Sequence, residues 1–308
     1  MKSLLKFISG LFLAVFAVTS EAGPKPAPSV QATPLPYHQV SFEVHGRELT
    51  RAHFRPELKR PFLYPVIGPS GRTLTRMGHP HDPVTHSHHN SVWLAHAKVN
   101  GVDFWSDGGK GRIVHQRLEK LTDGDDAASA TTFNVWIDEA KQQTLLAERR
   151  RITVVPKEEG AALIVIDCQL EAKTDVIFGK TPFGFLGVRM AKNIGVRDGG
   201  GTIRNSAGGV NEKEVLWKPA KWVDYSGAVT RDVKRREGIA IFDHPHNPNH
   251  PCIFHVRDDG WMGASFSFAA PVELANGKTL RLRYGLYVHD TLSTDALESC
   301  WREFAKSD

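Results

Sequence analysis

Apolar and polar side chains alternate with a period of two residues along much of this 308-residue chain, and no other feature limits its fold as strongly. The alternation is clear at residues 38–45, 131–137 and 281–288. Because successive side chains of a β-strand point to opposite faces, each segment predicts a strand with one buried face. Residues 162–167 (ALIVID) are almost continuously apolar, which predicts a strand that is buried on both faces.

Turn signals of the Asn-Gly and Asp-Gly type separate these segments, as expected for strands joined by short connections. Helical periodicity is convincing only near the end of the chain, where Ser293 or Thr294 could cap a helix that runs to Phe304. Many short strands with frequent turns predict an all-β fold, a large antiparallel β-sandwich with a short C-terminal helix. We expect residues 37–308 to form this one domain.

The N-terminal residues have the composition of an export signal. Lys2 and Lys6 precede an apolar run at residues 11–18, and small residues end the segment. This pattern predicts a signal peptide at residues 1–22 and a periplasmic or secreted protein. Residues 23–36 are rich in proline and predict a flexible linker. No later apolar segment approaches the length of a membrane span, so we expect no membrane contact after cleavage.

Charge and cysteine content exclude few classes of function. The net charge of +5 is spread along the chain, apart from basic runs at residues 148–151 and 234–236. Such short runs are typical of solvated strand faces or loops, so we expect no nucleic-acid partner. Cys168, Cys252 and Cys300 lie far apart, and a disulfide between two of them stays open.

Histidine is crowded into two short segments, and this is the strongest functional signal. Ten of the 15 histidines fall within residues 79–96 and 244–255. In an extended chain His86 and His88 point to one face and His89 to the other. Three uses stay open: hydrogen bonds in a buried framework, binding of a divalent metal, and metal-free acid/base or sugar-binding chemistry.

The second histidine segment differs from the first because prolines interrupt it. They exclude a place within a sheet and predict a stiff, exposed loop. Such a loop could preorganise polar groups beside a substrate. The groups are Asp243, His244, His246, Asn247 and His250.

Metal sites of two specific kinds are disfavoured. No Asp or Glu follows His86 and His88 before Asp103, as a cupin-type site would need. The predicted mature N-terminus is glycine, which excludes a copper site built on an N-terminal histidine. A site of two histidines and one carboxylate stays open if Glu148 or Asp243 folds towards the histidines.

Aromatic residues supply a second ingredient of a sugar site. Trp93, Trp217, Trp222 and Tyr225 lie near glycine or charged residues rather than inside apolar runs. Flat rings beside polar side chains stack on sugar faces while the polar groups bind the hydroxyls. For Trp105 and Trp136 we instead expect core packing.

Over about residues 54–290 these motifs resemble a family of bacterial secreted proteins that is labelled methane oxygenase PmoA-like. The matching residues are His86, His88, His89 and Trp93; Asn100, Gly101, Asp103, Phe104 and Trp105; Glu148 and Arg150; Gly187 and Arg189; Trp217, Trp222, Asp224 and Tyr225; Gly238 to Asn247; and Pro251, His255 and Arg257. The chain departs from the family at Asn90, Ser91, Phe254 and residues 258–260.

The resemblance implies a supersandwich like that of galactose mutarotases, which occurs among exported glycan-processing proteins. Methane oxidation itself is not expected, because particulate methane oxygenase is an integral membrane protein and this chain lacks a spanning segment after its signal. Fold alone does not determine function, so the substrate does not follow from the resemblance.

We therefore expect an exported carbohydrate-active enzyme that epimerises, eliminates or hydrates a sugar or glycoside by histidine-based proton transfer. His88 or His89 would pair with His246 or Glu148 as acid and base. The expected substrate-binding residues are Arg76, Arg189, Trp222, Tyr225, Asp243, His244, Asn247, His255 and Arg257. The alternatives are an enzyme with a divalent metal on His86 and His88, and a non-catalytic glycan-binding module.

Overall fold

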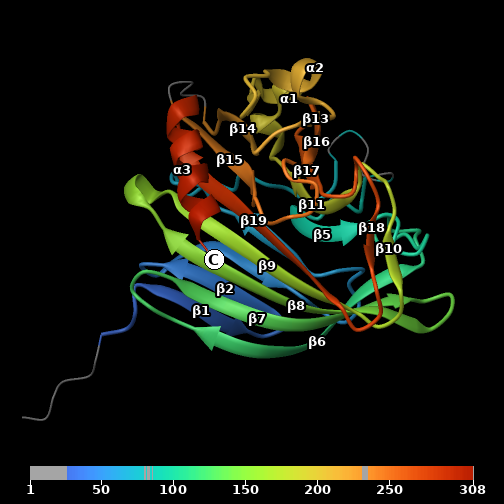
Figure 1. Cartoon of the computed structure of the whole chain (residues 1–308). Helices are drawn as coiled ribbons and strands as arrows, with labels where there is room; N and C mark the ends of the chain where they lie inside the picture. Colours follow the sequence, from blue (N-terminus) through green and yellow to red (C-terminus); the bar gives the residue numbers. More distant parts are fainter. Residues whose placement is uncertain (1–25, 80, 82–83, 85, 231–234, 308) are drawn as a thin grey trace, which may run out of the picture.

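The computed structural model describes residues 26–79, 81, 84, 86–230 and 235–307. Two large β-sheets face each other and form a sandwich, and α3 (Thr294–Lys306) packs against the outer side of one of them (Figure 1). Neighbouring strands of each sheet pair antiparallel. The predicted all-β sandwich with a short C-terminal helix is confirmed. Among the described residues, no helix has the length and apolar character needed to cross a membrane.

One sheet has nine strands. In spatial order they are β1 (Val30–Leu35), β2 (Gln39–Val44), β3 (Arg47–His53), β4 (Phe62–Val66), β5 (Val92–His96), β11 (Gly184–Arg189), β17 (Trp261–Ser265), β16 (Ile253–Arg257) and β13 (Lys218–Pro219).

The other large sheet has eight strands. In spatial order they are β12 (Thr202–Asn205), β14 (Trp222–Ala228), β15 (Arg236–Asp243), β19 (Thr279–Asp290), β9 (Ala162–Ala172), β8 (Gln143–Pro156), β7 (Ala128–Asp138) and β6 (Gly111–Thr122). The remaining elements are a two-stranded sheet of β10 (Val176–Phe178) and β18 (Val272–Leu274), the short helices α1 (Val196–Gly199) and α2 (Asn211–Val215), and the 3-10 turns η1 (Glu158–Gly160) and η2 (Lys192–Ile194).

The prediction of a linker at residues 23–36 is wrong for its second half. Val30–Leu35 forms β1, which pairs with β2 at the edge of the nine-stranded sheet. Pro34 is tolerated there because an edge strand leaves some of its backbone groups unpaired, and proline has no N–H to donate. The backbone N–H of Ala32 also donates to a carboxylate oxygen of Asp123 at 2.7 Å. The predicted signal peptide at residues 1–22 lies outside the described residues.

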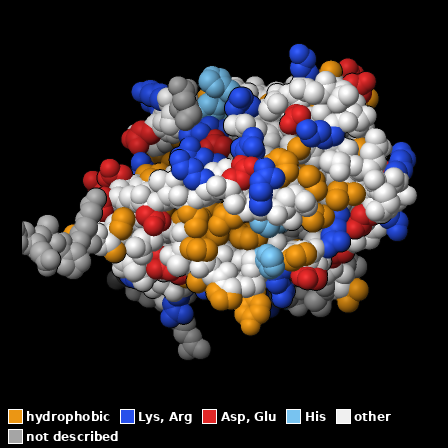
Figure 2. Space-filling view, turned by 90° about the horizontal axis from the view of Figure 1, so that it is seen from below, with side chains coloured by type: hydrophobic (Ala, Val, Ile, Leu, Met, Phe, Trp, Pro, Cys, Tyr) orange, Lys and Arg blue, Asp and Glu red, His pale blue; other side chains and the backbone are white. Residues whose placement is uncertain are grey.

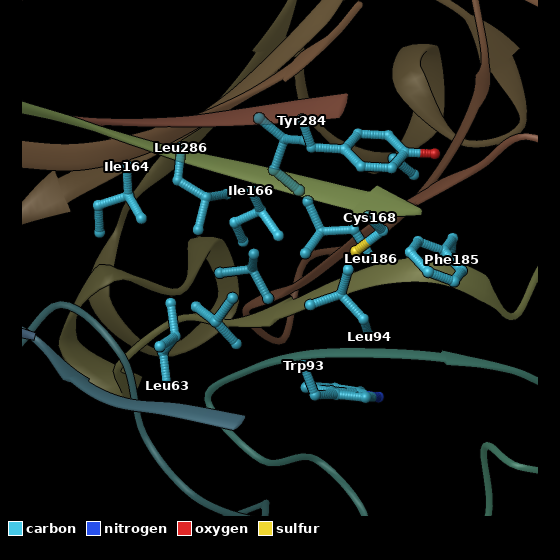
Figure 3. Packing of buried hydrophobic residues seen from close by; sticks show 14 of the residues in the cluster. Leu63, Trp93, Leu94, Ile164, Ile166, Cys168, Phe185, Leu186, Tyr284 and Leu286 are labelled. Atoms are coloured by element: carbon cyan, nitrogen blue, oxygen red, sulfur yellow. The ribbon is translucent and has the colours of Figure 1, made fainter. Parts of the chain in front are cut away.

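Apolar side chains from both sheets fill the space between them (Figure 3). Leu94 comes from the nine-stranded sheet, and Ile166 and Leu286 come from the eight-stranded sheet. A second apolar layer, which includes Leu163 and Phe304, lies under α3 on the outer face of the eight-stranded sheet. This layer explains why the run at residues 162–167 is apolar on both faces, as the sequence predicted.

The C-terminal helix begins where the sequence indicates. Ser293 is its N-cap, and its hydroxyl oxygen accepts a hydrogen bond from the backbone N–H of Ala296 at 3.2 Å. The bond satisfies one of the backbone donors that a helix N-terminus leaves unpaired. The helix continues to Lys306, two residues beyond the predicted end.

Charged side chains of both signs are interspersed on the molecular surface. On the face seen in Figure 2, hydrophobic side chains gather across the middle, and basic side chains lie mostly above them among acidic ones. This face therefore carries no field of a single sign.

Candidate functional site

The first histidine segment lies against the outer face of the nine-stranded sheet. In register, Trp93 of β5, Gly187 of β11, Gly263 of β17 and His255 of β16 form one row across four strands. Side chains alternate along β5, so Leu94 enters the space between the sheets and Trp93 lies on the opposite side of the strand (Figure 3).

Two glycines in this row leave room for tryptophan rings. A Cβ atom at Gly187 would lie 2.9 Å from ring atoms of both Trp93 and Trp261. A Cβ atom at Gly263 would lie 2.6 Å from the ring of Trp261. Both distances are too short for a real side chain, so glycine at these positions allows the two rings to lie close against the sheet.

Histidine rings pack on this aromatic layer. His89 stacks on Trp93 and on Trp261, with ring centroids 5.3 Å apart in each pair. The ring of His88 stands nearly perpendicular to that of His89 at 4.5 Å, and the ring of His86 lies 4.9 Å from His89. The folded segment thus brings His86, His88 and His89 together, although alternation in an extended chain would have separated them.

Arg189 and Asp259 form the charged part of the site. Arg189 Nη1 donates to Asp259 Oδ1 at 2.7 Å. His79 Nδ1 accepts the backbone N–H of His81 at 3.1 Å, so its Nε2 carries the proton and donates to Asp259 Oδ2 at 3.2 Å. Arg76 Nη2 donates to the backbone oxygen of Asp259 at 3.3 Å. Asp259 therefore connects Arg189 of β11 to the segment of Arg76 and His79, through its carboxylate and its backbone oxygen.

The pKa values in this part of the site follow from burial and from neighbouring charges. Burial alone would raise the pKa of Asp259, but its hydrogen bonds with Arg189 and His79 and the charge of Arg189 lower it to about 2. Burial lowers the pKa of Arg189, and Asp259 opposes this effect. Burial, together with the charge of Arg189, lowers the pKa of Arg76 to about 10. Asp259 is thus ionised and both guanidinium groups are charged at neutral pH.

Burial also favours the neutral form of His88, His89 and His255. It lowers the pKa of His89 far below its usual range, and the charge of Arg189 lowers it further. The pKa of His88 is lowered by burial and by the charge of Arg60. The pKa of His255 falls to about 4 through burial and the charge of Arg257. A neutral imidazole can accept a proton from a substrate.

A buried arginine outside the predicted set holds the histidine segment in place. Arg60 is 1% exposed. Its Nη1 donates to the backbone oxygen of His88 at 3.1 Å and to Asn90 Oδ1 at 2.7 Å. Its other nitrogens donate to the backbone oxygens of Phe104 and Trp105. Arg60 therefore links the segment to the loop that follows β5.

We call this assembly the histidine–tryptophan site. Its members are Arg76, His79, His86, His88, His89, Trp93, Arg189, His255, Asp259 and Trp261. Several of its buried polar atoms have no hydrogen-bond partner among the described residues: Arg76 Nε, His89 Nδ1, Trp93 Nε1, Arg189 Nε and Nη2, His255 Nδ1 and Trp261 Nε1.

A metal at the pair of His86 and His88 stays a prediction. Their ring centroids lie 6.1 Å apart. In the part of the chain that the structure describes, no three His, Cys, Asp or Glu side chains form a group that could hold a metal ion. The two carboxylates considered as a third ligand both lie elsewhere.

The predicted role of Glu148, one of these carboxylates, as an acid/base partner in the site is wrong. It lies on β8 and is fully buried. Its carboxylate pairs with Arg150 at 2.5 Å and accepts the indole N–H of Trp136 at 2.8 Å. These contacts neutralise the charge within the core, on the side of the nine-stranded sheet that faces away from Trp93.

Residues 243–250 of the second histidine segment do not share a cleft with the first, and only His255 of that segment joins the site. The segment follows β15 of the eight-stranded sheet, and Asn247 exchanges two hydrogen bonds with the backbone of Arg283 on β19, each 2.8 Å long. His244 and His246 line a hollow on the outer face of that sheet. The expected pairing of His246 with His88 or His89 is therefore wrong.

Within this segment Asp243, Asn247 and His250 stabilise the loop instead of presenting groups to a substrate. Asp243 Oδ1 accepts from Asn247 Nδ2 at 2.8 Å, and Asp243 Oδ2 lies 2.7 Å from His250 Nδ1. The backbone N–H of Cys252 also donates to Asp243 Oδ2, at 2.9 Å. Proline has no backbone N–H, so a proline-rich loop has few backbone donors. Asp243 accepts hydrogen bonds from donors that the loop retains and so holds it in shape.

Trp222 and Tyr225 are not exposed stacking residues. Trp222 is fully buried under α3, and its indole N–H donates to Glu298 Oε2 at 3.0 Å. Tyr225 is also buried, and its hydroxyl donates to the backbone oxygen of Arg257 at 3.3 Å. The side chain of Arg257 pairs with Glu212 at 3.1 Å. As predicted, Trp105 and Trp136 are buried in apolar packing, and Trp105 packs against Trp93 and Trp261.

Of the predicted residues, the site contains Arg76, His86, His88, His89, Arg189 and His255. Sequence reasoning did not select Asp259, Trp261 or Arg60 for it. Asp259 was visible only as part of an Asp-Gly turn signal, and Trp261 follows that turn directly. The only sign of these two site residues in the sequence was a charged residue and a tryptophan on either side of Gly260.

Solved structures similar to this chain share little sequence with it. A mutant of the heparan sulfate lyase HepC from Pedobacter heparinus matches at a TM-score of 0.45 and 11% identity, over 88% of this chain and 38% of the lyase, so the chain spans well under half of the lyase's length. A homologue of GalM/aldose epimerase from C. elegans matches at a TM-score of 0.35 and 6% identity, over 86% of this chain and 99% of the homologue.

A galactose mutarotase-like protein from Lactobacillus casei matches at a TM-score of 0.33 and 8% identity, over 78% of this chain and 97% of that protein. These likenesses are too weak to support an inference about activity, and the fold assignment stands on the strand topology of the chain itself. No curated protein matches the sequence. The resemblance to a methane-oxygenase-labelled family finds no support in these comparisons. The model of the family of unknown function DUF6807 matches residues 39–302, and the chain belongs to this family.

Proposed function

We propose that the chain is an enzyme that acts on a carbohydrate or a related oxygen-rich small molecule by proton transfer at the histidine–tryptophan site. His88 and His89 move the proton, and Arg76 and Arg189 bind substrate oxygens. The layer formed by Trp93 and Trp261 is the apolar floor of the site.

The unpartnered donors of the site carry this proposal. Indole and guanidinium N–H groups can only donate hydrogen bonds, and those of Trp93, Trp261, Arg76 and Arg189 include buried N–H groups without an acceptor. Each such group costs about 1–3 kcal/mol when it is left unsatisfied. A ligand with several hydroxyl or carboxyl oxygens would satisfy them together, which favours a sugar or a sugar acid.

Neutral imidazoles beside charged guanidinium groups suit the removal of a proton from a carbon next to a carbonyl or carboxyl group. Burial keeps His88 and His89 unprotonated at neutral pH, so each has a nitrogen that can accept a proton, and the larger depression of its pKa makes His89 the weaker base of the two. Arg189 would stabilise the negative charge that develops on the substrate oxygen. These roles fit epimerisation, elimination and hydration equally well.

The N-terminal sequence supports action outside the cytoplasm. Residues 1–22 combine Lys2 and Lys6 with an apolar run and a small-residue end, which is the composition of a cleaved signal peptide. We include export in the proposal. N-terminal sequencing of the protein recovered from a periplasmic extract tests it, and an uncleaved chain retained in the cytoplasm would contradict it.

Incubation of the purified protein with a panel of neutral and acidic sugars in D₂O tests the chemistry. Proton NMR should detect deuterium at the reacting carbon or an unsaturated product. His88→Ala and His89→Ala should each lower kcat/KM on the order of a hundredfold or more, because a positioned acid or base contributes that much. His45→Ala is the matched control, since this exposed histidine lies in the turn between β2 and β3, away from the site, and should leave the rate unchanged.

Two outcomes would contradict the proposal. Full activity in both His88→Ala and His89→Ala would exclude them as proton-transfer residues. Sugar binding by the wild type without turnover of any panel member would indicate a glycan-binding module instead of an enzyme.

A further inference from the structure

Four arginines lie on the outer face of the eight-stranded sheet, in two adjacent cross-strand rows. In one row Arg149 of β8 and Arg281 of β19 flank Gln169 of β9. In the next row Arg151 and Arg283 flank Asp167. The rows are two residues apart along the strands, which corresponds to about 7 Å. All four side chains point to the same face because they alternate with the buried residues of β8 and β19.

These side chains line a hollow of about 460 Å³, together with His244 and His246. A second hollow of about 300 Å³ continues from it towards α3. Arg151, Asp167 and Arg283 line both hollows. The two hollows together form an elongated groove, which we call the arginine groove.

Acidic side chains balance only part of this positive charge. Arg283 pairs with Asp167 at 2.5 Å, and Arg149 pairs with Glu119 at 2.6 Å. Arg151 and Arg281 have no acidic partner within 4 Å among the described residues. Two guanidinium groups, one from each row, are thus available to an anion.

A buried histidine adds a donor to the groove. His244 is 2% exposed, and its Nδ1 accepts the backbone N–H of His246 at 3.2 Å. Its Nε2 therefore carries the proton; this buried atom makes no hydrogen bond within 3.5 Å, although the backbone of Ser307 lies close enough to raise the pKa of the imidazole. Arg283 Nε is likewise buried without a partner. Burial lowers the pKa of His244, and the charge of Arg283 lowers it further.

We propose that the arginine groove binds an acidic oligosaccharide, whose carboxylate or sulfate groups pair with Arg151 and Arg281 and whose chain lies along the groove. A single small anion would occupy only one row. A chain of acidic sugars presents anionic groups at regular spacing and matches both rows at once. This second site lies on a different sheet from the histidine–tryptophan site and does not depend on the function proposed for that site.

Isothermal titration of the full chain at low ionic strength tests this inference. The ligands are a galacturonic acid trisaccharide, a sulfated disaccharide, a neutral galactose trisaccharide and inorganic sulfate. We expect the acidic oligosaccharides to bind and their affinity to fall with added salt, because exposed ion pairs are screened. The affinities of the carboxylated and sulfated sugars show which anionic group the groove prefers.

The double variant Arg151→Ala/Arg281→Ala should weaken this binding on the order of tenfold or more, since it removes two charge-assisted contacts. Both residues are exposed, so folding should be retained. Arg55→Ala, an exposed arginine on the loop after β3, is the matched control and should bind as the wild type does.

Unchanged affinity in the double variant would overturn the inference, as would the absence of any binding at low salt. Equal affinity for the neutral trisaccharide, or for sulfate alone, would also overturn it. His88→Ala/His89→Ala should bind the acidic trisaccharide in the groove normally, which separates this result from the outcome for the histidine–tryptophan site.

Discussion

The carboxylate of Asp259 connects Arg189 and His79, so Asp259→Asn is the substitution that tests the electrostatics of the histidine–tryptophan site most directly. Asparagine keeps the size and the polar character of the side chain but removes its charge. Arg189 would then be a buried guanidinium without a counter-ion, and His79 would lose its charged acceptor. Both effects destabilise the folded chain.

The pKa of Asp259 sets the size of the effect. Its contacts lower the pKa from 3.8 to about 2 although burial acts in the opposite direction. Each factor of ten in proton affinity corresponds to about 1.4 kcal/mol, so the ionised carboxylate contributes roughly 2 kcal/mol at neutral pH. Because the folded-state pKa is depressed, this contribution is complete well above pH 3.8 and is lost as the pH falls towards 2.

Urea unfolding followed by tryptophan fluorescence measures the difference. At pH 7 the free energy of unfolding of Asp259→Asn should be about 2 kcal/mol below that of the wild type, and the deficit should shrink to roughly half at pH 3. Asp126→Asn, at an exposed position in the turn before β7, is the control and should unfold like the wild type. A deficit under about 0.5 kcal/mol at pH 7, or one that stays constant with pH, would refute the reasoning.

Three further substitutions test the packing around the two sheets. Burial lowers the pKa of His96 to about 3, so on acidification the unfolded chain takes up a proton that the folded chain does not, and the wild type loses about 2 kcal/mol of stability between pH 7 and pH 5. His96→Asn should abolish this loss. Identical pH dependence of the two proteins in urea titrations would contradict this. Gly187→Ala should cost about 1–3 kcal/mol and change the near-UV circular dichroism, because the added methyl group meets two tryptophan rings; an unchanged spectrum with full stability would exclude close packing there. Trp222→Phe should lower the melting temperature, because the hydrogen bond to Glu298 is lost, and should leave sugar binding unchanged. Loss of sugar binding without loss of stability would show that Trp222 contacts the ligand after all.

The sequence by itself was sufficient for several strands and for the C-terminal helix, whereas β1 at Val30–Leu35 was mistaken for a linker. Alternation at residues 131–137 and 281–288 predicts elements correctly because the two faces of a strand meet different surroundings, and that difference is written locally in the residue order. The N-cap at Ser293 is local in the same sense, since the bond it accepts comes from a residue three positions later. The crowding of histidine also identified one real cluster, at residues 79–89.

Only the tertiary structure decided which predicted residues meet. Glu148 and Trp222 have residue types that suit a sugar site, yet both are buried with partners of their own. His88 and His246 belong to similar histidine-rich segments, but the connections between strands carry those segments to different sheets.

The site residues that sequence reasoning missed have the same physical explanation. Asp259 acts through Arg189, which precedes it by 70 residues, and Arg60 acts on the backbone of His88, 28 residues later. Trp261 meets Trp93 over the glycine of a third strand. A local pattern reports which face of a strand is buried, whereas these contacts depend on which strands become neighbours, and strand order is determined by the packing of the whole sandwich.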